Sequence, residues 1–228
     1  MSQWQSEKML TAFLDRDGVI NRKRPSDYVK SWQEFEFLPG VFDALRTLKQ
    51  HGFRLIVVTN QRGISLGRFS ENDLAVIHER MQAELRKAGG ELDAIYYCPH
   101  GYDSCDCRKP GIGLFLRAQR DFPDIRFSNS FLVGDSVEDM EAGERLRCRK
   151  VLIEVDGAGI ASLLARKNVR PDFSAPSLLE AVTNYLIPSP GSGAGEAKTA
   201  KETDEAGEPD EAPTRPMMSE IHNKKPLP

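Results

Sequence analysis

Short apolar segments alternate with amphipathic segments between residues 10 and 155, and this alternation constrains the fold more than any other feature of the sequence. The expected strands are 10–14, 53–58, 94–97, 130–133 and 151–155, and the expected helices are 40–51, 70–87, 114–122 and 137–146. Strands that are apolar along their whole length are typical of a sheet that is covered on both faces. The pattern therefore predicts an α/β fold with a doubly wound parallel sheet.

Polar side chains follow several of these strands directly. Asp15 and Asp17 come after the first strand, Thr59 after the second, Lys109 opens a later segment, and Asp135 follows the fourth strand. In doubly wound sheets, ligands bind at the carboxyl ends of the strands. Two carboxylates at the mouth of an apolar sheet are costly unless a cation lies between them, so the sequence predicts a metal site there.

Composition places the chain among ordinary globular proteins. It has 228 residues, of which 39% are hydrophobic and 29% charged. The longest apolar runs are of strand length and residues 1–8 lack a secretory signal, so we expect a cytoplasmic protein without membrane association. A monomer is the default expectation.

Residues 188–228 differ in composition from the rest of the chain. They hold seven of the fourteen prolines and no Phe, Trp or Tyr, with five Lys/Arg against eight Asp/Glu, which leaves 26 of each in residues 1–187. We expect a folded domain over 1–187 and a disordered tail over 188–228 that is not needed for activity. The absence of a basic surplus argues against nucleic-acid binding, whereas local clusters of Arg and Lys favour a small anionic ligand.

Four potential zinc ligands lie within ten residues: Cys98, His100, Cys105 and Cys107. In a reducing compartment such a cluster binds metal more often than it forms disulfides. Four protein ligands fill a tetrahedral zinc site and leave no position for water, so the predicted zinc is structural. Cys148 is interpreted as an ordinary core or surface residue.

The stretch Phe13-Leu14-Asp15-Arg16-Asp17-Gly18 resembles the first motif of the haloacid dehalogenase-like phosphatases. This resemblance implies a Rossmann-like fold, with Asp15 as the nucleophile that forms an aspartyl-phosphate and Asp17 as general acid and base. It also implies that Thr59 and Lys109 bind the transferring phosphoryl group. Magnesium would be held by the carboxylates of Asp15 and Asp135 and by the backbone carbonyl of Asp17.

The zinc loop, from Cys98-Pro99-His100 to Cys105-Asp106-Cys107-Arg108-Lys109-Pro110, is similar to that of one branch of this superfamily, the D-glycero-D-manno-heptose 1,7-bisphosphate phosphatases and histidinol-phosphate phosphatases. Members of the branch lack a large cap domain. The resemblance implies hydrolysis of heptose bisphosphate to heptose 1-phosphate or 7-phosphate, on the route to ADP-heptose and lipopolysaccharide core. The implied substrate contacts are Asn60, Gln61, Arg62, Arg108 and Lys109.

Some residues leave alternatives open. Ser136 stands where heptose phosphatases often carry a lysine, and the interval between His100 and Cys105 is short, which keeps histidinol phosphate as an alternative substrate. Asp135 could instead cap a helix, and Asp139 could lie behind the metal ligands without binding the metal, or on the helix surface. Residues 22–24 are weaker candidates for substrate binding. An alternative of a different class is a non-catalytic, zinc-stabilised binding module.

Overall fold

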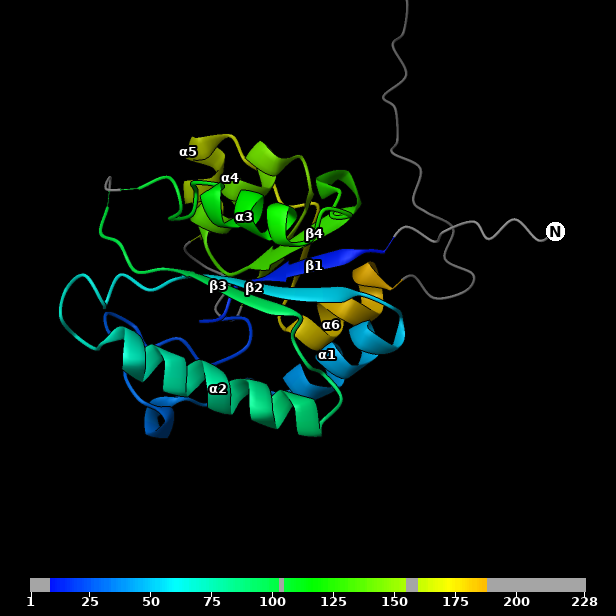
Figure 1. Ribbon diagram of the computed structural model, residues 1–228. Coiled ribbons are helices and arrows are strands. Elements are labelled where there is room, and N and C mark those ends of the chain that lie inside the picture. Colours follow the sequence, from blue (N-terminus) through cyan, green and yellow to red (C-terminus); the bar gives the residue numbers. More distant parts are fainter. Residues whose placement is uncertain (1–8, 103–104, 155–159, 188–228) are drawn as a thin grey trace, which may run out of the picture. The chain divides into compact units, whose positions relative to one another are not determined.

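The computed structural model describes residues 9–102, 105–154 and 160–187, in which a parallel sheet lies between two layers of helices (Figure 1). The strands are β1 (Thr11–Leu14), β2 (Arg54–Asn60), β3 (Ala94–Cys98), β4 (Ser130–Gly134), β5 (Arg149–Ile153) and β6 (Phe173–Ala175). Their order is β3-β2-β1-β4-β5-β6, and all neighbouring pairs are parallel. The predicted doubly wound parallel sheet is confirmed, and its order reverses between β1 and β4.

Helices cover both faces of the sheet. They are α1 (Val41–Gln50), α2 (Glu71–Lys87), α3 (Gly113–Asp121), α4 (Val137–Leu146), α5 (Ile160–Lys167) and α6 (Leu178–Ala181), with short turns of other helix types at Trp32–Glu34, Phe127–Asn129 and Val182–Leu186. Helices α3, α4 and α5 lie on one face, and α1, α2 and α6 lie on the other (Figure 1). In the described part of the chain, no domain-sized insertion interrupts this pattern, as expected for a protein without a large cap.

Most predicted elements agree with the structure to within two residues, and the differences follow from strand pairing. Strand β2 continues to Asn60 because Thr59 and Asn60 pair with Tyr97 and Cys98 of β3. Strand β5 begins at Arg149, in register with Phe131, whereas the predicted strand began at residue 151. No element after residue 155 was predicted, so α5, β6, α6 and the last helical turn are additions from the structure.

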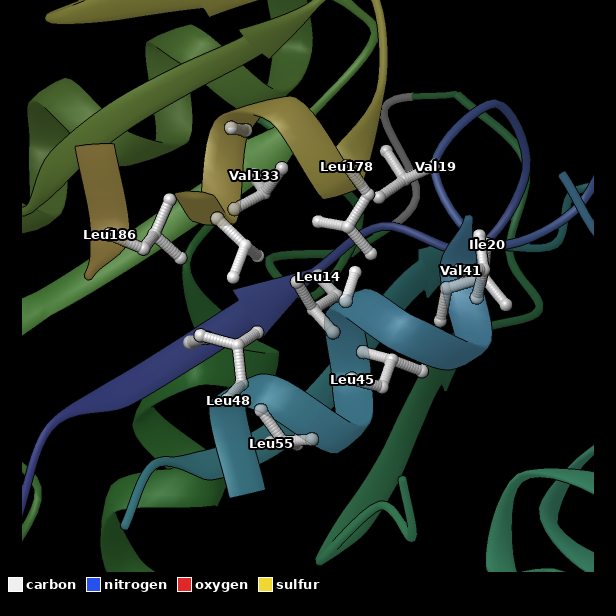
Figure 2. Packing of buried hydrophobic residues seen from close by; sticks show 14 of the residues in the cluster. Leu14, Val19, Ile20, Val41, Leu45, Leu48, Leu55, Val133, Leu178 and Leu186 are labelled. Carbon is white, nitrogen blue, oxygen red and sulfur yellow. The ribbon is translucent and has the colours of Figure 1, made fainter. Parts of the chain in front are cut away.

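Alternate residues of the strands fill apolar cores on both faces of the sheet. Leu14 of β1 packs with Leu45 and Leu48 of α1 (Figure 2). Phe13, on the other face, packs edge-on against Phe115 of α3 with ring centroids 5.2 Å apart. A fully buried leucine contributes about 1.5–3 kcal/mol through the area it removes from water. These cores fix β1 from both sides and thereby fix the position of the residues that follow it.

None of the helices described is long and apolar enough to cross a membrane. The predicted tail, 188–228, lies outside the described residues, as do 1–8.

Candidate active site

A buried lysine joins the ends of three strands. Lys109 is 2% exposed; its Nζ lies 2.8 Å from Asp15 Oδ1 after β1 and donates to the backbone oxygen of Val58 in β2 at 2.7 Å. The same Nζ lies 2.6 Å from Asp139 Oδ1 on α4, the helix that follows β4. Burial alone would lower the pKa of Lys109, but the carboxylates of Asp139 and Asp15 outweigh it and raise this pKa. Lys109 is therefore a fixed positive charge beside Asp15.

Asp135 reaches the same site from the end of β4, and two glycines make room for the acidic groups. Its Oδ2 accepts from Lys23 Nζ at 2.7 Å. A Cβ on Gly18, which has a φ of +95°, would lie 2.2 Å from that oxygen, and a Cβ on Gly134 would lie 2.2 Å from Asp139 Cγ. A side chain at either glycine would push a carboxylate out of place.

Asp15, Asp135 and Asp139 each bring a carboxylate oxygen to one place, with these atoms within 4.8 Å of one another. Burial raises the pKa of Asp15 to about 7; Lys109 opposes this shift, whereas Asp139, Asp135 and Asp17 add to it. Burial also raises the pKa of Asp135, whose Oδ1 is buried without a hydrogen-bond partner. Two oxygens on one magnesium ion are about 3–4 Å apart, so this cluster fits a hard divalent cation.

The side chain of Asp17 points into a separate set of donors. Its carboxylate accepts from Arg16 Nη2 at 3.0 and 2.9 Å, from Asn21 Nδ2 at 2.9 Å and from Gln61 Nε2 at 2.8 Å. Burial would raise the pKa of Asp17, but the charge of Arg16 and these hydrogen bonds outweigh it and hold the pKa below its ordinary value. Its carboxylate is not part of the Asp15, Asp135 and Asp139 cluster.

The residues at the end of β2 differ in what their side chains do. Thr59 is buried beside the site and accepts from Gln61 Nε2 at 3.0 Å. Asn60 holds the backbone of Lys109 with two hydrogen bonds, from its Nδ2 to Lys109 O at 3.1 Å and from Lys109 N to its Oδ1 at 3.0 Å. Among the predicted substrate contacts, the buried Gln61 bonds to Thr59 and Asp17, and Asn60 lines the pocket while it fixes Lys109.

A cavity of about 430 Å³ lies over these groups. Its lining includes Asp15, Asp17, Lys23, Thr59, Asn60, Tyr102, Arg108, Lys109 and Asp135. Tyr102 and Arg108 also line a neighbouring cavity of about 890 Å³ between the loop that carries Cys105 and helices α3, α4 and α5. The carboxylates and Lys109 therefore open onto a space that can hold a small metabolite.

Two arginines lie against one exposed tyrosine. The guanidinium carbons of Arg62 and Arg108 are 4.1 and 4.6 Å from the ring centroid of Tyr102, distances at which cation–π attraction orients a guanidinium. Neither arginine forms an ion pair within the described residues. Arg62 Nε and Arg108 Nη1 are buried without a hydrogen-bond partner. This arrangement can bind an anionic group.

The predicted zinc ligands come together as expected for a metal site. Ligand atoms of Cys98, His100, Cys105 and Cys107 lie within 4.8 Å of one another, with sulfur–sulfur distances of 3.1 to 3.5 Å and no disulfide. A tetrahedral site with Zn–S bonds of about 2.3 Å requires sulfur–sulfur distances of about 3.8 Å, so a small outward shift admits the ion. Cys148 is a buried core residue outside this cluster, consistent with its interpretation.

The structure also decides between the interpretations left open by the sequence. Ser136, not Asp135, is the N-cap of α4, and Asp139 forms its capping box. Asp139 is fully buried and is therefore not a helix-surface residue. Of residues 22–24, Lys23 pairs with Asp135, whereas Arg22 pairs with the exposed Glu36 of its own loop. The sequence does not single out Lys23 as a residue of the site, because Arg22 and Arg24 beside it carry the same charge.

The cavity, the strand-end carboxylate and the buried lysine are the groups that an enzyme acting on phosphate esters requires. The chain belongs to the haloacid dehalogenase-like phosphatases: a family profile described as "Polynucleotide kinase 3 phosphatase" matches residues 10–177. It is an enzyme of the phosphoric monoester hydrolase class. The alternative of a non-catalytic, zinc-stabilised binding module is not supported.

Among proteins of this family, the chain is similar to phosphatases of heptose bisphosphate. The chain is 47% identical over 138 residues to the D-glycero-beta-D-manno-heptose-1,7-bisphosphate 7-phosphatase of Escherichia coli O6:H1 (57% of this chain, 71% of the relative). It is 45% identical over 130 residues to the corresponding alpha-anomer phosphatase of Mycobacterium bovis (57% and 68%). A crystal structure of D,D-heptose 1,7-bisphosphate phosphatase from B. bronchiseptica, complexed with magnesium and phosphate, matches with a TM-score of 0.68 at 33% identity, over 76% of this chain and 96% of that one.

Proposed function

We propose that the chain hydrolyses the 7-phosphate of D-glycero-D-manno-heptose 1,7-bisphosphate and releases heptose 1-phosphate and inorganic phosphate. The observation that carries this proposal is a pair of arginines, Arg62 and Arg108, that form no ion pair with any described residue and lie beside the pocket that contains Asp15 and Lys109. A monophosphate needs one site for anionic oxygens, whereas a bisphosphate needs two. The relatives named above act on this sugar and support the same substrate.

In the first step, a carboxylate oxygen of Asp15 attacks the phosphorus, and the bond from phosphorus to the sugar oxygen breaks. Lys109, 2.8 Å from Asp15 Oδ1, offsets the negative charge of the transferring group, and the Thr59 hydroxyl can donate to one of its oxygens. The lowered pKa keeps Asp17 ionised in the free site, so Asp17 takes up a proton as the negatively charged phosphoryl group binds and then gives this proton to the leaving sugar oxygen. In the second step, water attacks the same phosphorus, Asp17 takes the proton from that water, and Asp15 is restored.

We propose Asp15, Asp135 and the backbone carbonyl of Asp17 as the magnesium site. The buried, unpartnered Asp135 Oδ1 and the raised pKa of Asp15 support this assignment. A bound magnesium ion neutralises the carboxylates and the phosphoryl oxygens. Asp139 is assigned instead to Lys109, which it contacts at 2.6 Å. The Cys98, His100, Cys105 and Cys107 cluster is proposed as a structural zinc site that holds Arg108 and Lys109 in place.

The test is release of inorganic phosphate from the alpha and beta anomers of heptose 1,7-bisphosphate and from histidinol phosphate, each with magnesium and with EDTA. We expect magnesium-dependent turnover of one or both heptose bisphosphates, with a kcat/KM well above that for histidinol phosphate. Analysis of the product distinguishes loss of the 7-phosphate from loss of the 1-phosphate. Preferred hydrolysis of histidinol phosphate would contradict the proposal, and the relatives of both anomer types make both sugar substrates necessary.

A further inference from the structure

Arg16, which lies between Asp15 and Asp17 in the sequence, is a buried cation like Lys109 and contacts His78 of helix α2. Its side chain is fully buried, and its Nη2 donates to both carboxylate oxygens of Asp17. Its Nη1 lies 3.1 Å from Nε2 of His78. His78 is 8% exposed and belongs to α2, which packs on the face of the sheet that carries α1 and α6 (Figure 1).

The chemistry of arginine fixes the direction of this contact. A guanidinium can only donate hydrogen bonds, so His78 Nε2 is the acceptor and its ring carries the proton on Nδ1. Because the guanidinium is planar and rigid, an acceptor that fixes Nη1 also sets the direction in which Nη2 points. Nη2 in turn holds the Asp17 carboxylate through two hydrogen bonds.

We propose that His78 is a positioning residue for phosphoryl transfer, which acts through Arg16 to orient the Asp17 carboxylate toward the leaving oxygen. The proposal rests on the proposed role of Asp17 as the proton donor. Asn21, in the loop after β1, and Gln61, directly after β2, hold the same carboxylate, so loss of His78 loosens one of three supports. We therefore expect a partial effect on the proton-transfer step and none on binding of the phosphoryl group.

A leaving-group comparison separates this role from a structural one. A sugar alkoxide leaves from phosphorus only with a proton, whereas 4-nitrophenolate leaves without one. We compare the wild type with His78→Leu, which removes the acceptor, and with His78→Gln, whose amide oxygen can replace Nε2. The rate measured is the first phosphoryl transfer to the enzyme, from rapid-quench release of heptose 1-phosphate and from the burst of 4-nitrophenolate. The burst amplitude counts functional sites, so partial misfolding of a variant does not enter the rate constant.

For His78→Leu, we expect the transfer from the sugar to slow about 10- to 100-fold, with KM unchanged, and the nitrophenolate burst rate to stay within about threefold of wild type. His78→Gln should restore most of the sugar rate. Equal slowing of both substrates, or slowing of neither, would overturn the proposal. If His78→Leu gives no folded protein, His78→Asn, which is polar but too short to reach Arg16, takes its place with the same expectation.

The same experiment reports separately on the proposed function. Asp15→Asn should show no burst with either ester. If the wild type shows an Asp15-dependent nitrophenolate burst but does not hydrolyse heptose bisphosphate, the proposed substrate fails. His78 is then tested with the alkyl phosphate that the wild type hydrolyses fastest, and the same two outcomes support or overturn its role.

Discussion

Buried His78 should make the protein less stable in mild acid, by an amount that can be worked out from its pKa. Burial and the charge of Arg16 lower the pKa of His78 from 6.5 to about 3, although the charge of Asp17 acts in the opposite direction. The imidazole ring also packs against the ring of Tyr97, with centroids 6.0 Å apart. The unfolded chain therefore binds a proton below pH 6.5 that the folded protein excludes until about pH 3. The stability from neutral His78 is complete above pH 6.5 and is lost as the pH falls toward 3.

The expected loss is about 1.4 kcal/mol for each pH unit below the unfolded pKa, or about 2 kcal/mol between pH 7 and pH 5. Urea denaturation of the wild type and His78→Gln at both pH values, with the same metal content, measures it. Carboxylates titrate in both proteins, so the difference between their pH dependences isolates His78. If both proteins lose the same unfolding free energy between pH 7 and pH 5, the buried neutral histidine is refuted.

Three further changes test other parts of the site. Asp139→Asn removes one of two carboxylates facing Lys109, so it should lower the free energy of unfolding by about 1–3 kcal/mol and should also lower kcat. Urea denaturation unchanged from the wild type would contradict the pairing of Asp139 with Lys109. Cys107→Ala should lose zinc in metal analysis and melt at a lower temperature than the wild type, whereas Cys148→Ala, outside the cluster, should keep its zinc. Equal zinc content in the two variants would exclude this ligand set. Tyr102→Ala loses two cation–π contacts and should lower kcat/KM for heptose bisphosphate about 5- to 30-fold, whereas Tyr102→Phe should keep the wild-type kcat/KM. Equal kinetics of the two variants would show that the ring does not orient the arginines.

The strands and the positions of the acidic residues were predictable because both depend on local patterns. Fully apolar runs identify buried strands, and a parallel sheet brings the residues that follow them to one edge. For this reason Asp15 and Asp135 could be expected to meet although they are 120 positions apart in the chain, and their carboxylates do lie in one cluster. The close spacing of three cysteines and one histidine between residues 98 and 107 likewise predicted that their side chains meet in one cluster.

What could not be predicted are contacts between side chains that no pattern links. Lys23 and Arg22 look equivalent in sequence, yet only Lys23 reaches Asp135, because the loop places Arg22 beside Glu36. His78 lies among apolar residues of an amphipathic helix, where a histidine gives no signal of its contact with Arg16. The elements after residue 155 were missed because short strands and helices such as β6 and α6 have too few residues for a clear period.

In the proposed reaction, Asp15 carries the phosphoryl group between the two steps. Acid quenching during turnover of heptose bisphosphate, followed by peptide mapping with mass spectrometry, tests it directly. We predict a phosphorylated peptide with the modification on Asp15, sensitive to hydroxylamine and absent from Asp15→Asn. A phosphoryl group on another residue, or full activity of Asp15→Asn, would contradict this role of Asp15.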